Sequence, residues 1–466
     1  MVFSKAEFLY YFLPITLLVY YLTPMPGGST RYRNLTLLLA SLVFYAWGEP
    51  KYVFLMAAQC ASAWVFGLLI HRYRAKSKAL MLLSVALSLS GLLFFKYANF
   101  FLTNVNHVTG AGLPLLRLML PIGISFYTFQ TMSYTIDLYR GNVEVQRNLF
   151  DFSTYVVFFP QLIAGPIVRY IDVAEALGSR KHSLAQFARG ARRFIIGLGK
   201  KVLMANLLGE LVDIFKNGDD KSLLFVWLYL VAYTLHIYYD FSGYSDMAIG
   251  LGHIFGFSFP ENFNYPYIAD SITDFWRRWH MTLSSWFRDY VYIPLGGNRV
   301  APLRFSINIL TVWMLTGFWH GADWNFMLWG LYYGVFMLIE KHLLGAWLER
   351  SPMFVRRVYV FLCLFVSWTI FDGNGLQDTL TTLTGMFGLG GGGLAGREAL
   401  YYLRSYMVPI LIGVFGSTPV PKRIAQTLSH KKAFLVVEPL ALALLLLAST
   451  AFIIDGSFNP FIYFRF

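Results

Sequence analysis

The stretch DSITDFWRRWHMTLSSWFRDYVYIPLGGNR, residues 270–299, and the later MLTGFWHGADWNF, residues 314–326, carry the features that decide the fold. They contain His280 and His320. Residues 305–319 are nearly uncharged and apolar, which predicts a membrane helix that ends at His320. An ionisable group at that depth is costly and is a functional hypothesis by default. The competing interpretation is a structural histidine that is hydrogen-bonded to a backbone carbonyl.

The first of these segments predicts one amphipathic helix. Ser271 followed by Asp274 has the capping-box pattern. Apolar side chains then recur at steps of three and four and form one stripe, and three arginines fall on the other side. The stripe is Ile272, Phe275, Trp276, Trp279, Leu283, Trp286, Phe287 and Tyr290, and the arginines are Arg277, Arg278 and Arg288. Such a helix suits a membrane interface, so we expect His280 on its flank, nearer to water than His320.

Composition excludes an ordinary soluble protein. The chain has 466 residues, of which 57% are hydrophobic and 14% charged, and its mean hydropathy is +0.53. A soluble protein carries about 25% charged residues. Long apolar stretches recur along the chain, which predicts an all-α, polytopic membrane protein. The net charge of +13 fits basic cytoplasmic loops better than nucleic-acid binding. Cys60 and Cys363 lie in apolar segments, which excludes a disulfide framework.

Apolar runs place the expected membrane helices. They are 8–23, 34–47, 52–70, 79–101, 115–138, 195–214, 222–241, 305–319, 324–340, 354–371, 397–416 and 433–454. Prolines and glycines interrupt 115–138 and 149–170, which predicts kinked, broken or re-entrant helices. The Gly- and Ser-rich run 238–252 predicts close helix packing. The basic loop 71–78 is expected inside and loop 102–113 outside, which places the N-terminus outside.

Three kinds of chemistry compete at the two histidines. A metal site would use them with Asp323, but no further ligand has helpful spacing, so no metal is predicted. A serine nucleophile would be Ser284 or Ser285, yet no G-x-S-x-G elbow is present. We favour a buried, neutral histidine that accepts a proton from an alcohol as a general base. The alcohol then attacks a pre-activated acyl donor, such as a cytoplasmic thioester, so no bound cofactor is needed.

Other side chains have expected places around this chemistry. Arg277, Arg278 and Arg288 suit the phosphates of a thioester carrier, with Trp276 and Trp286 beside them, and lipid headgroups are the alternative ligand. Near His320, we expect Trp319 and Trp324 to exclude water and Gly321 to leave room for a substrate. Asp323 and Asn325 are expected to line the pocket or tunnel.

Taken together, these motifs resemble the membrane-bound O-acyltransferase (MBOAT) family. DFWRRWHMTLSSWFRDYVYIPLGG and FWHGADWNF carry the resemblance, and further motifs are similar to the alginate O-acetyltransferase branch. These are MVFSKAEFLYYFLPITLLVYYL, SLVFYAWGEPKYVFLM, LPIGISFYTFQTMSYTIDLYRG, FFPQLIAGPIVRY, YYDFSGYSDMAIGLGHIFGFSFPENFNYPY and the terminal NPFIYFRF. The D-alanyl-transferring branch shares the central motif, but its N-terminal region is less similar.

The resemblance implies a single membrane-embedded domain over residues 1–466. It would consist of a ring of about eleven membrane helices, with re-entrant and interfacial helices, around a thinned centre. His320 matches the family's catalytic histidine and His280 its second motif histidine.

The resemblance also implies the reaction. An acyl group, expected to be acetyl, passes from a cytoplasmic thioester (acetyl-CoA or an acyl carrier protein) to a hydroxyl on the far side of a bacterial plasma membrane. An extracytoplasmic esterase-like partner would complete O-acetylation of a polysaccharide. The rival function is a proton-coupled transporter or flippase, in which the histidines relay protons and the broken helices bind a solute.

Overall fold

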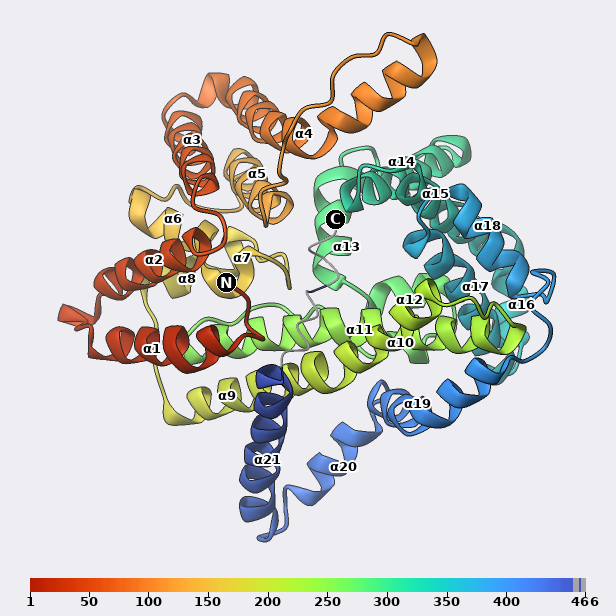
Figure 1. Ribbon diagram of the computed structural model, residues 1–466. Coiled ribbons are helices and arrows are strands. Elements are labelled where there is room, and N and C mark those ends of the chain that lie inside the picture. Colours follow the sequence, from red (N-terminus) through yellow and green to blue (C-terminus); the bar gives the residue numbers. More distant parts are fainter. Residues whose placement is uncertain (456–460, 462–466) are drawn as a thin grey trace. The chain divides into compact units, whose positions relative to one another are not determined.

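All regular elements in the described residues, 1–455 and 461, of this computed structural model are helices, which confirms the all-α class (Figure 1). The chain divides into two compact units, residues 1–194 with 245–260 and residues 195–244 with 261–466. The prediction of a single domain is not decided by this division.

The helices of the first part of the chain are η1 (Phe8–Phe12), α1 (Leu13–Leu22), η2 (Pro26–Gly28), α2 (Arg31–Ala46), α3 (Tyr52–Arg72), η3 (Arg74–Lys76), α4 (Ser77–Thr109), α5 (Ile124–Arg140), α6 (Leu149–Val157), α7 (Phe159–Leu162), α8 (Tyr170–Gly178) and α9 (Leu184–Gly199). Those that follow are η4 (Lys200–Ala205), α10 (Asn206–Asn217), α11 (Leu223–Ile254), η5 (Pro266–Ile268), α12 (Ile272–Arg278), α13 (Met281–Phe287), η6 (Arg288–Tyr292), α14 (Pro302–His320), α15 (Trp324–Ile339), η7 (Glu340–Leu344), α16 (Gly345–Arg350), α17 (Met353–Asp372), α18 (Leu376–Gly385), α19 (Arg397–Gly416), α20 (Val420–Leu428) and α21 (Phe434–Ile454).

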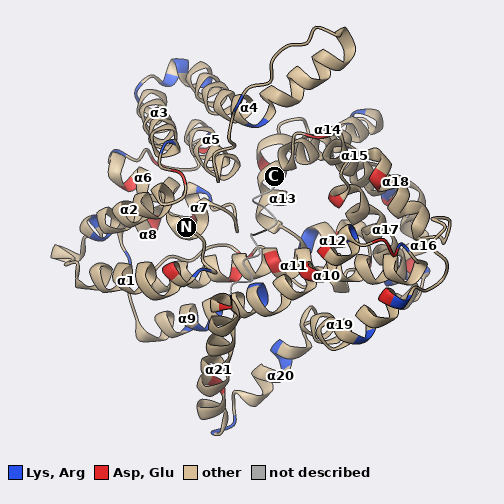
Figure 2. Ribbon diagram, in the orientation of Figure 1, with Lys and Arg blue, Asp and Glu red and all other residues tan. Residues whose placement is uncertain are grey.

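Six helices of the described chain are long and apolar enough to cross a membrane, which supports a multi-pass membrane protein. They are Tyr52–Arg72, Arg74–Thr109, Leu223–Ile254, Met353–Asp372, Arg397–Gly416 and Phe434–Ile454. Figure 2 shows that most of the ribbon carries no charged residue. The apolar window of α21 is only 6% buried, as expected for a helix that faces lipid, whereas that of α11 is 78% buried. The predicted number of about eleven crossings stays a prediction.

Helix α11 confirms the close packing predicted for residues 238–252. A Cβ added to Gly243 would lie 2.9 Å from the carbonyl oxygen of Gly197, and one on Gly250 would lie 2.7 Å from that of Gly190. Small residues thus let the helix backbones approach closely. The predicted end of this helix at residue 241 is wrong, because α11 continues without a break to Ile254.

Two predicted spans within the first 140 residues are shorter in the structure. The first, 8–23, is a helical run of only 15 residues, Phe8–Leu22, and is not among the six long apolar helices. The second, 115–138, is helical only from Ile124, because Gly123 has φ +78° and packs against the Leu162 carbonyl. The interruption of 149–170 is confirmed, since α6 ends at Val157 and the short α7 follows.

The prediction that one amphipathic helix follows the Ser271 cap and continues through Tyr290 is wrong. The backbone turns at His280, whose φ of +43° is left-handed, and separates α12 from α13. Ser271 does cap α12, accepting a hydrogen bond from Asp274 N at 2.9 Å. The buried Glu340 carboxylate also accepts hydrogen bonds from the Ile272 and Thr273 amides, where a negative charge is favourable. Tertiary contacts of this kind outweigh the local periodicity.

Candidate functional site

His320 is positioned by the antiparallel pair α14 and α15. A Cβ on Gly317 or on Gly330 would collide with the backbone of the opposite helix, at Phe326 and Trp313 respectively, so both positions need glycine for this close approach. As predicted, the apolar helix ends at His320. The close helix contact fixes the end of α14, and with it the backbone that carries the imidazole.

The His320 side chain lies among aromatic rings and is 4% exposed. Its ring centroid is 4.9 Å from Trp319, 5.0 Å from Trp329 and 5.4 Å from Phe371. The Trp329 and Phe371 rings are nearly perpendicular to the imidazole, at 82° and 83°. These edge-to-face contacts hold the imidazole in an environment with little room for water.

His280 is held by a polar contact that the sequence did not point to. Its Nδ1 lies 3.0 Å from Asn262 Oδ1, which also accepts a hydrogen bond from Thr282 Oγ1 at 2.8 Å. An oxygen acceptor places the imidazole proton on Nδ1, so Nε2 carries the lone pair. Burial lowers the pKa of His280 to about 3, because the charged ring would lose its hydration. The geometry therefore presents a neutral imidazole with a defined tautomer.

Trp319 joins the two histidines into one site. Its ring centroid is 6.1 Å from His280 and 4.9 Å from His320. The structure thus places two histidines that are forty positions apart in the sequence on either side of one tryptophan ring. The prediction that His280 is nearer to water is wrong, because His280 is 1% exposed and His320 is 4% exposed. The turn at His280 points its ring inward, with the Phe241 ring 4.7 Å away.

The predicted donor-binding residues are distributed over different environments. Arg277 is exposed, whereas Arg278 pairs with Asp274 at 2.8 Å and Arg288 with Asp289 at 2.6 Å. The tryptophans are buried, Trp276 against the Trp313, Trp329 and Tyr333 rings and Trp286 against Phe287 and Tyr290. Their role in donor binding stays a prediction.

The predicted pocket residues next to His320 have mainly structural contacts. The Asp323 carboxylate caps α15 by accepting from Asn325 N at 3.1 Å. Asn325 donates from its side chain to the Gly373 carbonyl, and so ties α15 to the residues that follow Phe371. Gly321 does not leave room for a substrate, because a Cβ there would collide with the Phe326 ring. Trp324 is 54% exposed, so the expectation that it excludes water from His320 is wrong.

Sequence reasoning missed Asn262, Trp329 and Phe371. Asn262 lies 18 residues before His280 in a segment without regular structure, so no periodicity indicated it. The signal available was its place in the motif PENFNYPY, which belongs to one of the segments that resemble the family. Trp329 and Phe371 belong to apolar helices, where aromatic residues are ordinary core residues and give no separate signal.

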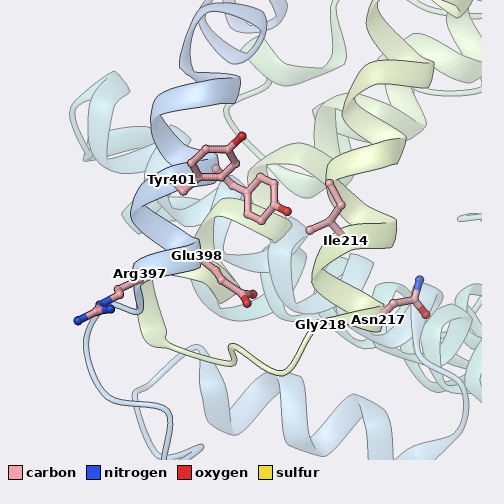
Figure 3. A pocket seen from close by; sticks show the side chains of 7 residues that line it. Ile214, Asn217, Gly218, Arg397, Glu398 and Tyr401 are labelled. Carbon is pink, nitrogen blue, oxygen red and sulfur yellow. The ribbon is translucent and has the colours of Figure 1, made fainter.

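A surface pocket elsewhere in the second unit offers no comparable chemistry (Figure 3). It lies between α10 and α19 and is lined by Ile214, Asn217, Gly218, Arg397, Glu398, Tyr401 and Tyr402. None of these is a predicted site residue. The pair of histidines around Trp319 therefore remains the candidate site.

Comparison with known proteins finds similarity to membrane-bound acyltransferases. The family model described as MBOAT, membrane-bound O-acyltransferase family, matches residues 144–371, which include both histidines. A probable alginate O-acetylase from Azotobacter vinelandii is 39% identical over 100% of both chains. A peptidoglycan O-acetyltransferase from Helicobacter pylori is 34% identical over 86% of this chain and 83% of its own. A teichoic acid D-alanyltransferase from Bacillus subtilis is 31% identical over 46% of this chain and 58% of its own.

Proposed function

Because the chain belongs to the membrane-bound O-acyltransferase family, it is a membrane acyltransferase, and we propose that it O-acetylates a polysaccharide outside the cytoplasm. The donor in this proposal is a cytoplasmic thioester, acetyl-CoA or an acyl carrier protein, and the location is the plasma membrane of a bacterium. One observation carries the choice of acetyl transfer. The reported relatives that match most or all of the chain are named as an O-acetylase and an O-acetyltransferase, whereas the D-alanyltransferase matches 46% of the chain.

In the proposed reaction His320 is the general base. The acceptor hydroxyl gives its proton to the imidazole while its oxygen attacks the acyl carbon of the thioester. The C–O bond forms, the C–S bond breaks, and the imidazolium returns the proton to the leaving thiolate. The Trp329 and Phe371 rings limit access of water, which favours transfer over hydrolysis. His280, oriented by Asn262, is assigned a positioning role.

Acyl transfer by the purified, reconstituted protein tests this function. Proteoliposomes without an ion gradient receive radiolabelled acetyl-CoA, acetylated carrier protein or D-alanylated carrier protein, with a polysaccharide present. We expect acetyl transfer without any gradient. Preferential use of the D-alanyl donor would instead support the function of the D-alanyl-transferring branch. Gradient-dependent uptake of a solute would support the rival function of a transporter or flippase. His430→Ala, which replaces an exposed histidine, is the matched control for variants of His320 and His280.

The proposal includes an extracytoplasmic esterase-like partner that delivers the acetyl group to the polymer. Adding such a protein to the outer side of the vesicles should raise polymer acetylation without changing the donor that is used. Equal polymer acetylation with and without the partner would remove it from the proposal and leave the membrane chain as the complete transferase.

A further inference from the structure

A second polar cluster lies in the first unit, and its residues are remote in sequence from His280 and His320. It combines Tyr20 at the end of α1, Arg33 and Asn34 at the start of α2, and Arg180 and His182 between α8 and α9; we call it the Arg33–Arg180 cluster. Arg33 is 8% exposed and Arg180 is 5% exposed. Burying a guanidinium group costs desolvation free energy unless the group is paired and hydrogen-bonded. The hydrogen-bond partners of Arg33 and Arg180 therefore decide whether that cost is offset.

Arg180 uses only part of its hydrogen-bonding capacity. Its Nη1 donates to Asn34 Oδ1 at 2.7 Å and to the Ala176 carbonyl at 2.9 Å, and its Nε donates to Tyr20 Oη at 3.3 Å. The Phe257 ring lies 4.4 Å from the guanidinium carbon. Nη2 is buried and has no hydrogen-bond partner among the described residues. Two N–H groups of a buried cation thus remain for an acceptor.

Arg33 is held mainly by neutral groups. Its Nε donates to the Thr23 carbonyl at 3.1 Å, and its Nη1 lies 3.2 Å from His182 Nδ1. Neither Arg33 nor Arg180 forms an ion pair with a carboxylate of the described chain. The nearest acid reaches the cluster indirectly, since Asp151 Oδ1 accepts from Asn34 Nδ2 at 2.7 Å. The cluster therefore has more positive than negative charge.

His182 is neutral in this arrangement, for a geometric reason. Arginine only donates, so His182 Nδ1 accepts from Arg33, and the ring proton lies on Nε2. Nε2 then donates to Tyr20 Oη at 2.9 Å, and the Tyr20 hydroxyl donates to the Phe255 carbonyl at 2.8 Å. Burial and the two guanidinium groups lower the pKa of His182 to about 4. The imidazole therefore completes the cluster without adding a third positive charge.

We propose that the Arg33–Arg180 cluster binds a phosphate group. The planar guanidinium fork matches phosphate oxygens and can bind two of them at once. A phosphate monoester carries about −1.5 to −2 charges at neutral pH, which offsets two arginines. Large apolar side chains nearby in sequence are exposed, Leu22 by 73% and Leu184 by 89%, as expected for a surface that meets lipid. The phosphate therefore belongs either to a lipid headgroup or to a soluble phosphate compound.

The titration of His182 measures occupancy without relying on transfer activity. The full chain, with its histidine rings labelled with ¹⁵N, is placed in nanodiscs of phosphatidylcholine. One sample then receives inorganic phosphate at constant ionic strength, and another contains phosphatidic acid. The His182 signal is assigned by its loss in His182→Gln. We expect a bound anion to raise the pKa of His182 by about one unit or more, because it compensates the two guanidinium charges.

Variants distinguish this site from general surface attraction. Arg33→Gln and Arg180→Gln should abolish the response to the anion, whereas Arg31→Gln, an exposed arginine on the same helix, should keep it. Thermal unfolding of each variant checks that it is folded, and Arg33→Gln suffices if Arg180→Gln is not. A response to phosphatidic acid alone identifies a lipid headgroup, and one to inorganic phosphate identifies a soluble ligand. No response to either, or an equal loss in Arg31→Gln, would overturn the proposal.

Discussion

Replacing Asn262 by alanine tests how the site orients His280. The substitution removes the acceptor of the His280 ring N–H at 3.0 Å and of the Thr282 hydroxyl at 2.8 Å. A buried donor left without a partner costs about 1–3 kcal/mol. Because at least two donors lose this acceptor, we expect the free energy of unfolding to fall by about 2–6 kcal/mol. Without the Asn262 oxygen the ring proton is free to move to Nε2, so we also expect kcat to fall at least tenfold while KM changes less.

The assay is acetyl transfer by reconstituted variants at matched protein amounts, together with thermal unfolding. Asn264→Ala is the matched control, because Asn264 lies in the same segment, is exposed and contributes backbone atoms to its hydrogen bonds. Asn262→Ala that is destabilised but retains the parent kcat would refute the orienting role and leave a structural one.

The pH profile of Asn262→Asp adds a readout that a structural role would not change. In the parent, His280 has a pKa of about 3, so its protonation does not limit activity above pH 5. A carboxylate at position 262 keeps the acceptor and stabilises the imidazolium, which raises the pKa by about 1–3 units. We therefore expect the acidic limb of the rate profile to move to higher pH in this variant. An unchanged limb would contradict the assignment of His280 to the reaction site.

Three further predictions concern the rest of the chain. Cysteines introduced at Lys76 and Asn106 should be labelled from opposite sides of the membrane, and equal labelling from outside would reject the predicted topology. Arg277→Ala should raise the donor KM severalfold without impairing insertion, and unchanged use of a limiting donor would favour lipid-headgroup contact instead. Lys201→Met removes the buried ammonium group that lies 2.5 Å from the buried Asp240 carboxylate, so the free energy of unfolding should fall by about 3–5 kcal/mol. Adding Asp240→Leu should restore much of this loss, and no fall in the single variant would show that the pair is not stabilising.

Many of the helices are predictable from the sequence because a membrane helix needs a long apolar segment and must satisfy its backbone hydrogen bonds internally. The predicted helix 397–416 coincides with α19, and 324–340 differs from α15 by one residue at its end. His320 was likewise found from its place at the end of an apolar run. These features depend on local sequence, so one sequence is sufficient to predict them.

The predictions that were wrong concern features set by contacts between segments that are distant in the sequence. The break at His280 interrupts a regular aromatic stripe. Nothing local to it signals that Asn262 binds the His280 ring or that the Met281 amide donates to the Asn262 carbonyl. Gly321, next to the proposed base His320, suggested space for a substrate, whereas Phe326 fills that space. The terminal motif NPFIYFRF lies outside the described residues except for Phe461. Pairing of this kind is set by the tertiary fold, which periodicity does not report.

The activity of His320 variants tests whether His320 is the general base. Acyl transfer is measured for purified His320→Ala and His320→Gln, with His430→Ala as the control, after each is shown to insert and to unfold at the parent temperature. General base catalysis contributes about 10²–10⁴-fold, so we predict that both His320 variants lose at least a hundredfold in kcat and that His430→Ala retains the parent rate. We expect His280→Ala to lose less kcat than either His320 variant, because His280 is assigned a positioning role. A folded His320→Ala that stays within a few-fold of the parent would contradict the proposed base.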